Sequence, residues 1–524
     1  MELPFVGDTI NSFVSGFLSI VATLFVLAIC IGFISLIVIY IIDVTQTKQA
    51  IRRNYPVVGR FRYFFEHLGE FFRQYFFSMD REELPFNRAE RSWVYRAAKH
   101  IDTTVAFGST KDLKPAGTTI FVNCAFPTLG ADAVPPGEVT IGPYAERPYV
   151  TRSLYNISGM SYGALSAPAI TALANGAKKT RCWMNTGEGG VSPFHLEPGC
   201  DLVVQIGTAK YGVRDLEGNL DDGRLKQLAT YEQVRMFEIK LSQGAKPGKG
   251  GILPGAKVSP QIAEIRGIRV GEDSISPNRH PDINSVDDLL NVLNHIRNLT
   301  GRPVGFKSVI GASGWLEELF DEVQRRGIES APDFITVDGA EGGTGAAPMP
   351  LIDEVGLPLR EGLPLVVDKL NLYGLRDRVK VIASGKLVHP AKVAWALCMG
   401  ADFCTSARGF MFALGCIQAL QCNKNTCPTG ITTHDVKLQR GLDPVNKAQR
   451  VASFQDQIEH EVGIIAHSCG VHEPRQLRRF HCRVEHDKGR TIPQDEIYPD
   501  QATAEPEPDT KAGNKKPSDK IERC

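Results

Sequence analysis

The stretch "FITVDGAEGGTG", residues 334–345, combines the two patterns that decide the fold of this chain. It begins with a short run of apolar and β-branched residues and ends in a cluster of glycines. A short apolar run bounded by turn residues is typical of a buried strand. The sequence therefore predicts a buried strand here, followed by a glycine-rich loop at its carboxyl end.

The same arrangement recurs along the chain. The other candidate strands and their loops are "YNISGMSYGALS" (155–166), "CWMNTGEGG" (182–190), "LVVQIGTAKYG" (202–212), "MFEIKLSQGAKPG" (236–248), "PVGFKSV" (303–309), "VKVIASGK" (379–386) and "DFCTSARG" (402–409). Helical patterns follow several of them, at 166–180, 286–301, 315–327 and 389–400. Repeated βα units predict an α/β fold, a (β/α)8 TIM barrel with its site at the carboxyl ends of the strands. A doubly wound sheet is the alternative, but no GxGxxG opens a helix after the first strand.

The composition of the chain is close to that of a globular protein. The 524 residues are 43% hydrophobic and 23% charged, enough for one large α/β domain with extensions. The net charge of zero argues against nucleic acid as the main partner. The 50 glycines indicate tight turns or backbone that must approach a ligand closely.

The first part of the chain is apolar. No charged residue lies between Asp8 and Asp43, and a bilayer span needs roughly 20 apolar residues. The acidic flank, the long apolar core and the lack of a cleavage site argue against a signal peptide. Basic residues follow the run, among them Lys48, Arg52 and Arg53. The positive-inside rule then predicts a single-pass protein of the inner (cytoplasmic) membrane with its catalytic domain in the cytoplasm.

These patterns predict four regions. Residues 1–50 are expected to form a transmembrane anchor, and 51–90, which interleave aromatic with charged residues, an amphipathic juxtamembrane segment. An ordinary helix packed on the main domain is the alternative for the second region. Residues 91–490 are expected to form the barrel, and the polar residues 491–524 a disordered tail.

The strand ends carry the candidate binding residues. Gly342, Gly343, Thr344 and Gly345 leave backbone N–H groups unobstructed, which suits a phosphate or a flat ring, although such loops also serve as plain turns. "ASGK" (383–386) and "TSARG" (405–409) end the seventh and eighth strands, where barrels commonly bind phosphate. Lys307 is a cation in an apolar strand and is expected to pair with an anion or a cofactor, unless it points outward.

Two charged residues lie in glycine-rich loops after the second and fourth strands. Glu188 lies in "NTGEGG" and Lys246 in "GAKPGKGGILPG". Together they can bind an anionic substrate or move protons, and they are the candidate catalytic residues. Solvated loop charges are the alternative for either residue alone.

Three cysteines lie close together in "GCIQALQCNKNTCPTG", residues 415–430: Cys416, Cys422 and Cys427. A disulfide is disfavoured in the expected cytoplasmic compartment. Zinc usually takes four ligands, and only His434 is near in sequence. Iron–sulfur clusters use closely spaced thiolates, often with a proline after the last one, and Cys404 is a possible fourth ligand. Unligated core cysteines remain an alternative.

In order, the motifs "GMSYGALS", "NTGEGG", "GAKPGxGGxLPG", "ISPxxHxDI", "GGTGAAP", "GLRDRV" and "ALGCIxxxxCxxNTCPTG" resemble the FMN-binding synthase domain of glutamate synthases. The resemblance covers roughly residues 150–470 and is closest to stand-alone, membrane-anchored bacterial members of the family. It implies a (β/α)8 barrel in which FMN is bound by Ser161, Gln205, Lys307, Gly342, Gly343, Thr344, Gly345, Ser384 and Gly385.

The resemblance also implies an activity. Ammonia would convert 2-oxoglutarate to 2-iminoglutarate, and hydride from reduced FMN would give L-glutamate. A [3Fe–4S] cluster on Cys416, Cys422 and Cys427 would return electrons to the flavin. The electrons would come from ferredoxin or a reductase subunit, and the ammonia from a partner such as a separate glutaminase, because the chain carries no dinucleotide fingerprint and no amidotransferase domain.

Some residues depart from the family pattern. Ile252 replaces a glutamine that contacts the substrate carboxylate, Lys249 replaces an acid, and Glu341 replaces an aspartate. Isoleucine cannot hydrogen-bond a carboxylate. One alternative is therefore a flavin oxidoreductase that acts on another oxo or amino acid or passes electrons to the membrane. A non-enzymatic alternative is a membrane-anchored electron-transfer or scaffold protein.

Overall fold

The computed structural model describes residues 4–72, 76–487 and 489–499. The chain forms two compact units, residues 1–89 and residues 90–524. The second unit contains every candidate site residue.

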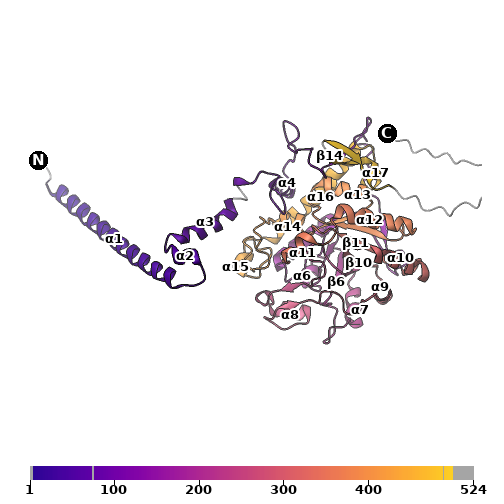
Figure 1. Cartoon of the computed structure of the whole chain (residues 1–524), viewed down its shortest axis with the longest axis horizontal. Helices are drawn as coiled ribbons and strands as arrows, with labels where there is room; N and C mark the ends of the chain where they lie inside the picture. The colour runs from indigo at the N-terminus through magenta and orange to yellow at the C-terminus, as the bar shows by residue number, and fades with distance from the viewer. Residues whose placement is uncertain (1–3, 73–75, 488, 500–524) are drawn as a thin grey trace, which may run out of the picture. The chain divides into compact units, whose positions relative to one another are not determined.

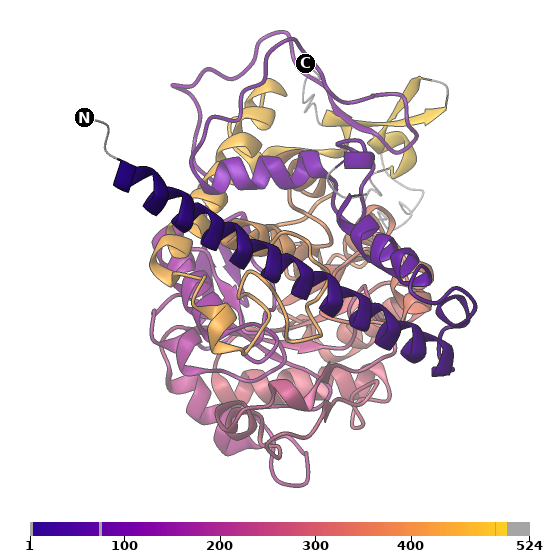
Figure 2. The ribbon, with the colours of Figure 1, turned by 90° about the vertical axis from the view of Figure 1, so that its left-hand side faces the viewer.

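The first unit consists of three helices, α1 (Pro4–Thr45), α2 (Ala50–Asn54) and α3 (Gly59–Phe72), and Figure 2 shows α1 as one long rod. The described residues contain one helix long and apolar enough to cross a membrane, Ser12–Thr45. Its last turn contains Asp43, whose carboxylate binds Arg52 at 2.7 Å and Arg60 at 2.8 Å and accepts a hydrogen bond from the Val57 N–H. These contacts fix the turn between α1 and the two short helices.

Helix α3 carries the aromatic residues of the expected amphipathic segment. Phe61, Phe64 and Phe65 lie on the helix with exposed side chains, at a spacing that places them on one face. The amphipathic juxtamembrane segment expected for residues 51–90 stays a prediction.

Eight parallel strands form a closed barrel in the second unit (Figure 1). They are β4 (Tyr155–Ile157), β5 (Met184–Asn185), β6 (Leu202–Ile206), β7 (Val234–Lys240), β10 (Val304–Val309), β11 (Phe334–Asp338), β12 (Lys380–Ser384) and β13 (Phe403–Ser406). Seven of them lie within segments expected to be strands, and β7 overlaps its expected segment, 236–248, but begins two residues earlier, so the (β/α)8 barrel is confirmed. The residues of β6 and β11 are all buried, as expected for parallel strands covered on both faces.

Helices connect the strands and cover the barrel. They are α5 (Ala167–Thr180), α6 (Pro193–Leu196), α7 (Asp222–Thr230), α8 (Pro260–Arg266), α9 (Val286–Thr300), α10 (Gly314–Arg326), α11 (Met349–Glu354), α12 (Leu359–Leu372), α13 (Pro390–Cys398), α14 (Arg408–Leu414), α15 (Val436–Gln439) and α16 (Pro444–Ser468). Helix α5 shows why they begin where they do: the Ser166 side chain accepts the Ala169 N–H, and Pro168 occupies the first turn. The expected helices at 166–180, 286–301, 315–327 and 389–400 are all present.

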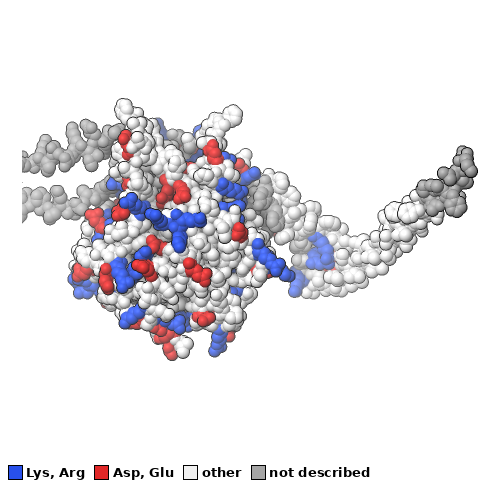
Figure 3. Space-filling model, turned by 180° about the vertical axis from the view of Figure 1, so that it is seen from behind, with Lys and Arg blue, Asp and Glu red and all other residues white. Residues whose placement is uncertain are grey.

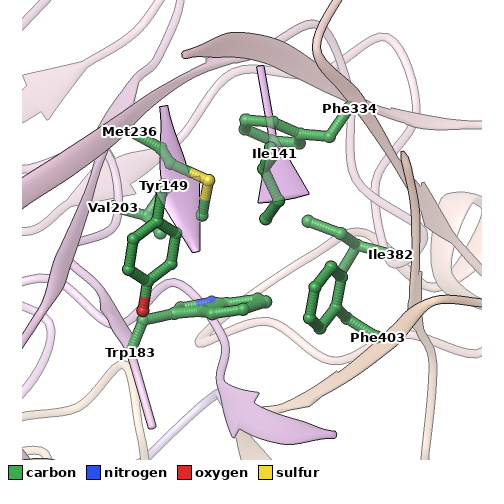
Figure 4. Close-up of a cluster of buried hydrophobic side chains, with 8 residues drawn as sticks. All are labelled: Ile141, Tyr149, Trp183, Val203, Met236, Phe334, Ile382 and Phe403. Atoms are coloured by element: carbon green, nitrogen blue, oxygen red, sulfur yellow. The ribbon is translucent and has the colours of Figure 1, made fainter. Parts of the chain in front are cut away.

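A small hairpin, β2 (Val139–Ile141) and β3 (Tyr149–Thr151), closes the amino-terminal end of the barrel. Figure 4 shows Ile141 and Tyr149 packed among side chains from the first residues of several strands. The cluster consists of Ile141, Tyr149, Trp183, Val203, Met236, Phe334, Ile382 and Phe403. All of them are almost fully buried, so an apolar plug fills this end.

An ion-pair triad lies beside the start of β11. Asp333, which is fully buried, binds Arg297 at 2.8 Å and Arg378 at 2.9 Å. Asp333 also accepts the Val304 N–H at 2.7 Å, so the triad joins the beginnings of β10 and β11 to the helical layer. Elsewhere the surface charges are mixed: Figure 3 shows both signs interspersed on one face, in keeping with the net charge of zero.

The remaining elements lie at the edges of the barrel. They are α4 (Arg88–Ala98), β1 (Thr119–Phe121), β8 (Ile252–Leu253), β9 (Ser274–Ile275), β14 (Cys482–Asp487), β15 (Arg490–Pro493) and α17 (Gln494–Ile497). The tail expected from residue 491 is wrong for its first residues, because β15 pairs antiparallel with β14 and α17 follows it. The residues of β15 and α17 are mostly polar, so their composition did not indicate that they would form a strand and a helix. The rest of the expected tail, from residue 500, lies outside the described residues.

Candidate functional site

A cavity of about 190 Å³ opens at the carboxyl ends of the barrel strands. The loops after β4, β5, β7, β11 and β13 contribute to its wall. The predicted site residues that line it are Ser161, Glu188, Gln205, Lys246, Gly343, Thr344, Gly345 and Cys422. The structure therefore brings together both candidate catalytic residues, most of the glycine-rich loop and one cysteine.

Other predicted residues lie elsewhere. Gly342, Ser384, Gly385, Cys416 and Cys427 are not among the lining residues of this cavity.

Lys307 lines a second, much smaller cavity in the barrel interior, together with Glu238 and Thr336. Its Nζ lies 3.3 Å from Asp338 Oδ2, so the strand lysine points inward and pairs with a protein carboxylate. The outward alternative for Lys307 is thereby excluded.

Glycines allow the loops around the cavity to pack closely. A side chain at Gly187, whose φ is 66°, would place its Cβ 2.7 Å from the Ser161 nitrogen. A Cβ at Gly251 would lie 2.9 Å from Glu188 Oε1. Gly187 therefore admits only glycine, whereas a side chain at Gly251 would displace the Glu188 carboxylate.

Glu188 is ionised and held by cations. Burial alone raises the pKa of this carboxyl, but Lys240, Lys246 and Arg266 together outweigh burial and lower the pKa below its ordinary value. The closest of these cations is Lys240, whose Nζ lies 3.1 Å from Glu188 Oε1. Lys240 also hydrogen-bonds the Gln243 side chain, so it fixes the carboxylate in place.

Lys246 is a buried cation, 8% exposed, and not a solvated loop charge. Burial and the neighbouring Lys240 lower the pKa of its ammonium group, whereas Glu188 raises it. The charge on Lys246 therefore depends on Glu188, and an anionic ligand would supply the further negative charge that stabilises it.

Arg266 is a lining residue that sequence reasoning missed. Its guanidinium is 5% exposed, lies 5.1 Å from the centre of the Tyr211 ring and donates to Ser274 Oγ at 3.2 Å. Among the described residues, its Nε has no hydrogen-bond partner. A buried donor without a partner favours an anionic ligand. Arg266 ends a short helix outside the expected motifs, and only the fold brings that helix to the cavity.

One wall of the cavity is apolar. Ile252, Leu253 and Met411 line it, and Ile252 is 49% exposed. The position at which the family pattern has glutamine thus faces the cavity in this chain.

The cysteine loop runs between α14 and α15 and forms no disulfide. Cys422 lines the cavity, with its Sγ 3.8 Å from Arg408. Burial, with smaller contributions from the nearby Cys422 and Cys427, raises the pKa of Cys416 to about 11. Within the described part of the chain, no three His, Cys, Asp or Glu side chains are arranged to hold a single metal ion.

The two other candidate ligands have different surroundings: Cys404 precedes the loop in the chain, and His434 lies near its end. Cys404 is fully buried in β13, and the His434 ring hydrogen-bonds the Gly163 carbonyl oxygen at 2.8 Å. The assignment of the three loop thiols to an iron–sulfur cluster therefore stays a prediction from their spacing in the sequence.

A parallel eight-stranded barrel with a cationic cavity at the carboxyl ends of its strands defines the class of (β/α)8-barrel enzymes. Residues 139–472 match the conserved region in glutamate synthase. The chain therefore belongs to the glutamate synthase family and is an oxidoreductase of the class that acts on the CH–NH2 group of donors.

Two relatives show the extent of the similarity. The chain is 38% identical over 493 residues to the glutamate synthase large subunit-like protein YerD of Bacillus subtilis, covering 87% of this chain and 93% of the relative. It is 35% identical over 324 residues to the archaeal-type glutamate synthase (NADPH) of Thermotoga neapolitana, covering 61% of this chain and 60% of the relative. The chain thus spans less than two thirds of the archaeal-type enzyme.

Solved structures give a more distant likeness. A mutant flavocytochrome b2 with pyruvate bound aligns with a TM-score of 0.44 at 15% identity, covering 87% of this chain and 93% of that chain. Mandelate oxidase with (S)-2-phenylpropionate aligns with a TM-score of 0.41 at 13% identity, covering 76% of this chain and 90% of that chain.

Proposed function

We propose that this chain is an FMN- and iron–sulfur-dependent glutamate synthase-like oxidoreductase. It would convert 2-oxoglutarate and externally supplied ammonia, through 2-iminoglutarate, to L-glutamate. The observation that carries the proposal is the pair of buried cations, Lys246 and Arg266, beside the ionised Glu188 in a family barrel.

FMN is the proposed resident cofactor. Ser161, Gln205 and the glycine-rich loop at Gly343, Thr344 and Gly345 would hold it in the cavity, with Lys307, Gly342, Ser384 and Gly385 as the remaining expected ligands. The loop supports this assignment because backbone N–H groups without side chains suit a phosphate or ring. When bound, FMN supplies the hydride that reduces the imine carbon.

The chain's own residues bind the substrate and manage protons. Arg266 and Lys246 would each pair with a carboxylate of 2-oxoglutarate, since both cations line the cavity and the Arg266 Nε has no partner in the described chain. Ionised Glu188 would orient the supplied ammonia beside the oxo carbon by accepting a hydrogen bond from it. Condensation releases water, and reduction of the imine takes up a hydride and a proton to give the amino acid.

Cys416, Cys422 and Cys427 would hold a [3Fe–4S] cluster beside the cavity, and Cys422 already lines its wall. Such a cluster carries single electrons from an external donor, for which ferredoxin or a reductase subunit is the proposed class. A separate glutaminase is the proposed source of ammonia.

Helix α1 would anchor the protein in the inner (cytoplasmic) membrane as a single span, with the catalytic unit in the cytoplasm. The long apolar helix and the basic residues after it support this orientation. Extraction of membranes with carbonate should leave the protein in the pellet, and protease added outside spheroplasts should leave the catalytic unit intact. Full release by carbonate would contradict the anchor.

The decisive experiment follows the flavin of the purified, detergent-solubilised protein. After anaerobic reduction, 2-oxoglutarate with ammonium should restore the oxidised flavin spectrum and yield one L-glutamate per flavin. Arg266→Ala should raise the 2-oxoglutarate concentration that this requires, whereas the exposed Arg269→Ala should not. A reduced flavin that these substrates do not reoxidise would refute glutamate synthesis.

One observation favours a second candidate. Ile252 places an apolar side chain where the family pattern has a carboxylate-binding glutamine, which suits an oxo acid with an apolar end. Faster reoxidation by a branched-chain 2-oxo acid than by 2-oxoglutarate, reversed in Ile252→Gln, would establish that alternative.

A further inference from the structure

A buried carboxylate organises the floor of the cavity. Glu238 lies on β7, is 2% exposed and lines the small interior cavity beneath the main one. Its Oε1 accepts hydrogen bonds from Asn185 Nδ2 at 2.8 Å and Gln205 Nε2 at 2.6 Å, and its Oε2 accepts the Thr336 hydroxyl at 2.6 Å. The carboxylate therefore joins side chains from β5, β6 and β11 across the barrel interior.

The network fixes the orientation of the Gln205 side-chain amide. An ionised carboxylate only accepts hydrogen bonds, so the amide must turn its NH2 group toward Glu238. The reversed amide would place two oxygen atoms at hydrogen-bond distance from each other. Because Gln205 also lines the main cavity, its Oε1 is the polar atom left for a ligand there.

The glycine at position 159 leaves room for the amide. A Cβ at Gly159 would lie 3.1 Å from Gln205 Nε2 and 3.2 Å from Gln205 Oε1, so the chain at this position lies close to the amide. Asn185 is fixed in the same way, since its Oδ1 accepts the Gly187 N–H at 2.9 Å while its Nδ2 binds Glu238. Glu238 thus orients two amides that neither solvent nor rotation can easily reorient.

We infer that Glu238 is a positioning residue that presents Gln205 Oε1 as a hydrogen-bond acceptor to the imide N–H of the bound flavin ring. The inference rests on the proposed function, because it takes FMN as the ligand. An imide N–H needs an acceptor, and an unmade hydrogen bond in a buried site is costly. The Gln205 amide could face the flavin with either its oxygen or its NH2 group. The hydrogen bond from its NH2 group to Glu238 selects the orientation in which the oxygen faces the flavin.

The test compares FMN with its N3-methyl derivative, which lacks the imide hydrogen. The full-length apoprotein is titrated with each flavin, and binding is followed by fluorescence quenching. The wild-type protein should bind FMN at least about tenfold more tightly than N3-methyl-FMN. A tenfold difference in affinity is what the loss of one buried hydrogen bond is expected to cause. In Glu238→Met, which removes the acceptor for the Gln205 and Asn185 amides, FMN should bind about tenfold more weakly and its preference over the methyl derivative should fall by a similar factor.

Two further variants control the result. Thr336→Val removes a different donor to Glu238 and leaves the Gln205 contact in place, so the preference should stay within about twofold of wild type. Gln205→Met removes the acceptor itself and should reproduce the loss, which keeps the test decisive if Glu238→Met does not fold. An unchanged preference in Glu238→Met or Gln205→Met would overturn the inference while leaving FMN binding intact. A wild-type protein that binds neither flavin would overturn the proposed function and the inference with it.

Discussion

The ammonium group of Lys257 donates a hydrogen bond to the carbonyl oxygen of Cys422 at 2.9 Å. It donates a second to the carbonyl oxygen of Thr432 at 2.7 Å, and the side chain is 2% exposed. A buried cation that bonds only to neutral carbonyls is uncommon, and a nearby anion stabilises it. Cys422 and Cys427 are the closest candidates, because both raise the pKa of Lys257, which burial lowers to about 8.

Lys257→Met should loosen the cysteine loop. Methionine fills the space but leaves two buried carbonyl groups without donors, at about 1–3 kcal/mol each. We expect less iron per chain in the purified protein, while the barrel retains its far-ultraviolet circular dichroism. Lys249→Met is the matched control, since Lys249 lies exposed in the preceding loop. Equal iron content in both variants would show that Lys257 does not organise the loop.

The three loop cysteines should be required for the cluster and Cys404 should not. Cys416→Ser, Cys422→Ser and Cys427→Ser each remove one thiolate from a set that has no spare ligand, so iron and acid-labile sulfide should be lost. Cys404→Ser changes a buried thiol of β13 and should retain both, although its stability can fall. Iron analysis and electron paramagnetic resonance of the oxidised proteins measure the outcome. Loss of iron in the Cys404 variant would identify it as a ligand.

Glu188→Gln should change the pH dependence of substrate binding. The pKa of Glu188 is lowered, so wild-type Glu188 stays ionised until the pH falls through that lowered value. Because Glu188 raises the pKa of Lys246, its loss lets that pKa fall further and Lys246 loses its proton at lower pH. When 2-oxoglutarate affinity is measured against pH, its fall on the alkaline side, the alkaline limb, should therefore occur at lower pH than in the wild-type protein. The exposed Glu197→Gln serves as control and should leave the limb in place.

Asp333→Asn should strongly destabilise the barrel. The substitution leaves Arg297 and Arg378 buried without their carboxylate, and breaking a buried ion pair typically costs about 3–5 kcal/mol. Glu317→Gln, which removes the more exposed partner of Lys369, should cost less than about 1 kcal/mol. Urea unfolding of the full-length protein compares the two. Similar midpoints for the two variants would contradict a structural role for the triad.

Much of the fold could be predicted from sequence because the barrel is built from local units. Each strand is a short apolar run that ends in glycine, and these signals do not depend on distant residues. Glu188 and Lys246 could be found in the same way, since glycine-rich loops mark the carboxyl ends of strands. The pairing of β15 with β14 could not, because its polar sequence resembles a tail.

The remaining site residues depend on contacts between distant segments. Arg266 ends a short helix, Lys257 ends a single 3-10 turn (Gly255–Lys257), and Glu238 lies in a strand that also contains Arg235 and Lys240. Nothing in their local sequence distinguishes them from ordinary surface or strand residues. Their roles come from the closed barrel, which brings Arg266 to the cavity and Glu238 beneath Gln205.

The plug formed by the β2–β3 hairpin has a consequence for traffic through the molecule. Ile141 and Tyr149 belong to the apolar cluster that fills the amino-terminal end of the barrel, so the described cavity opens at the opposite, carboxyl end. In the proposed reaction, ammonia, the oxo acid and protons would enter through the cavity that Lys246, Arg266 and Cys422 line. A group that binds deepest in this cavity would then have to enter before a substrate that binds nearer its opening.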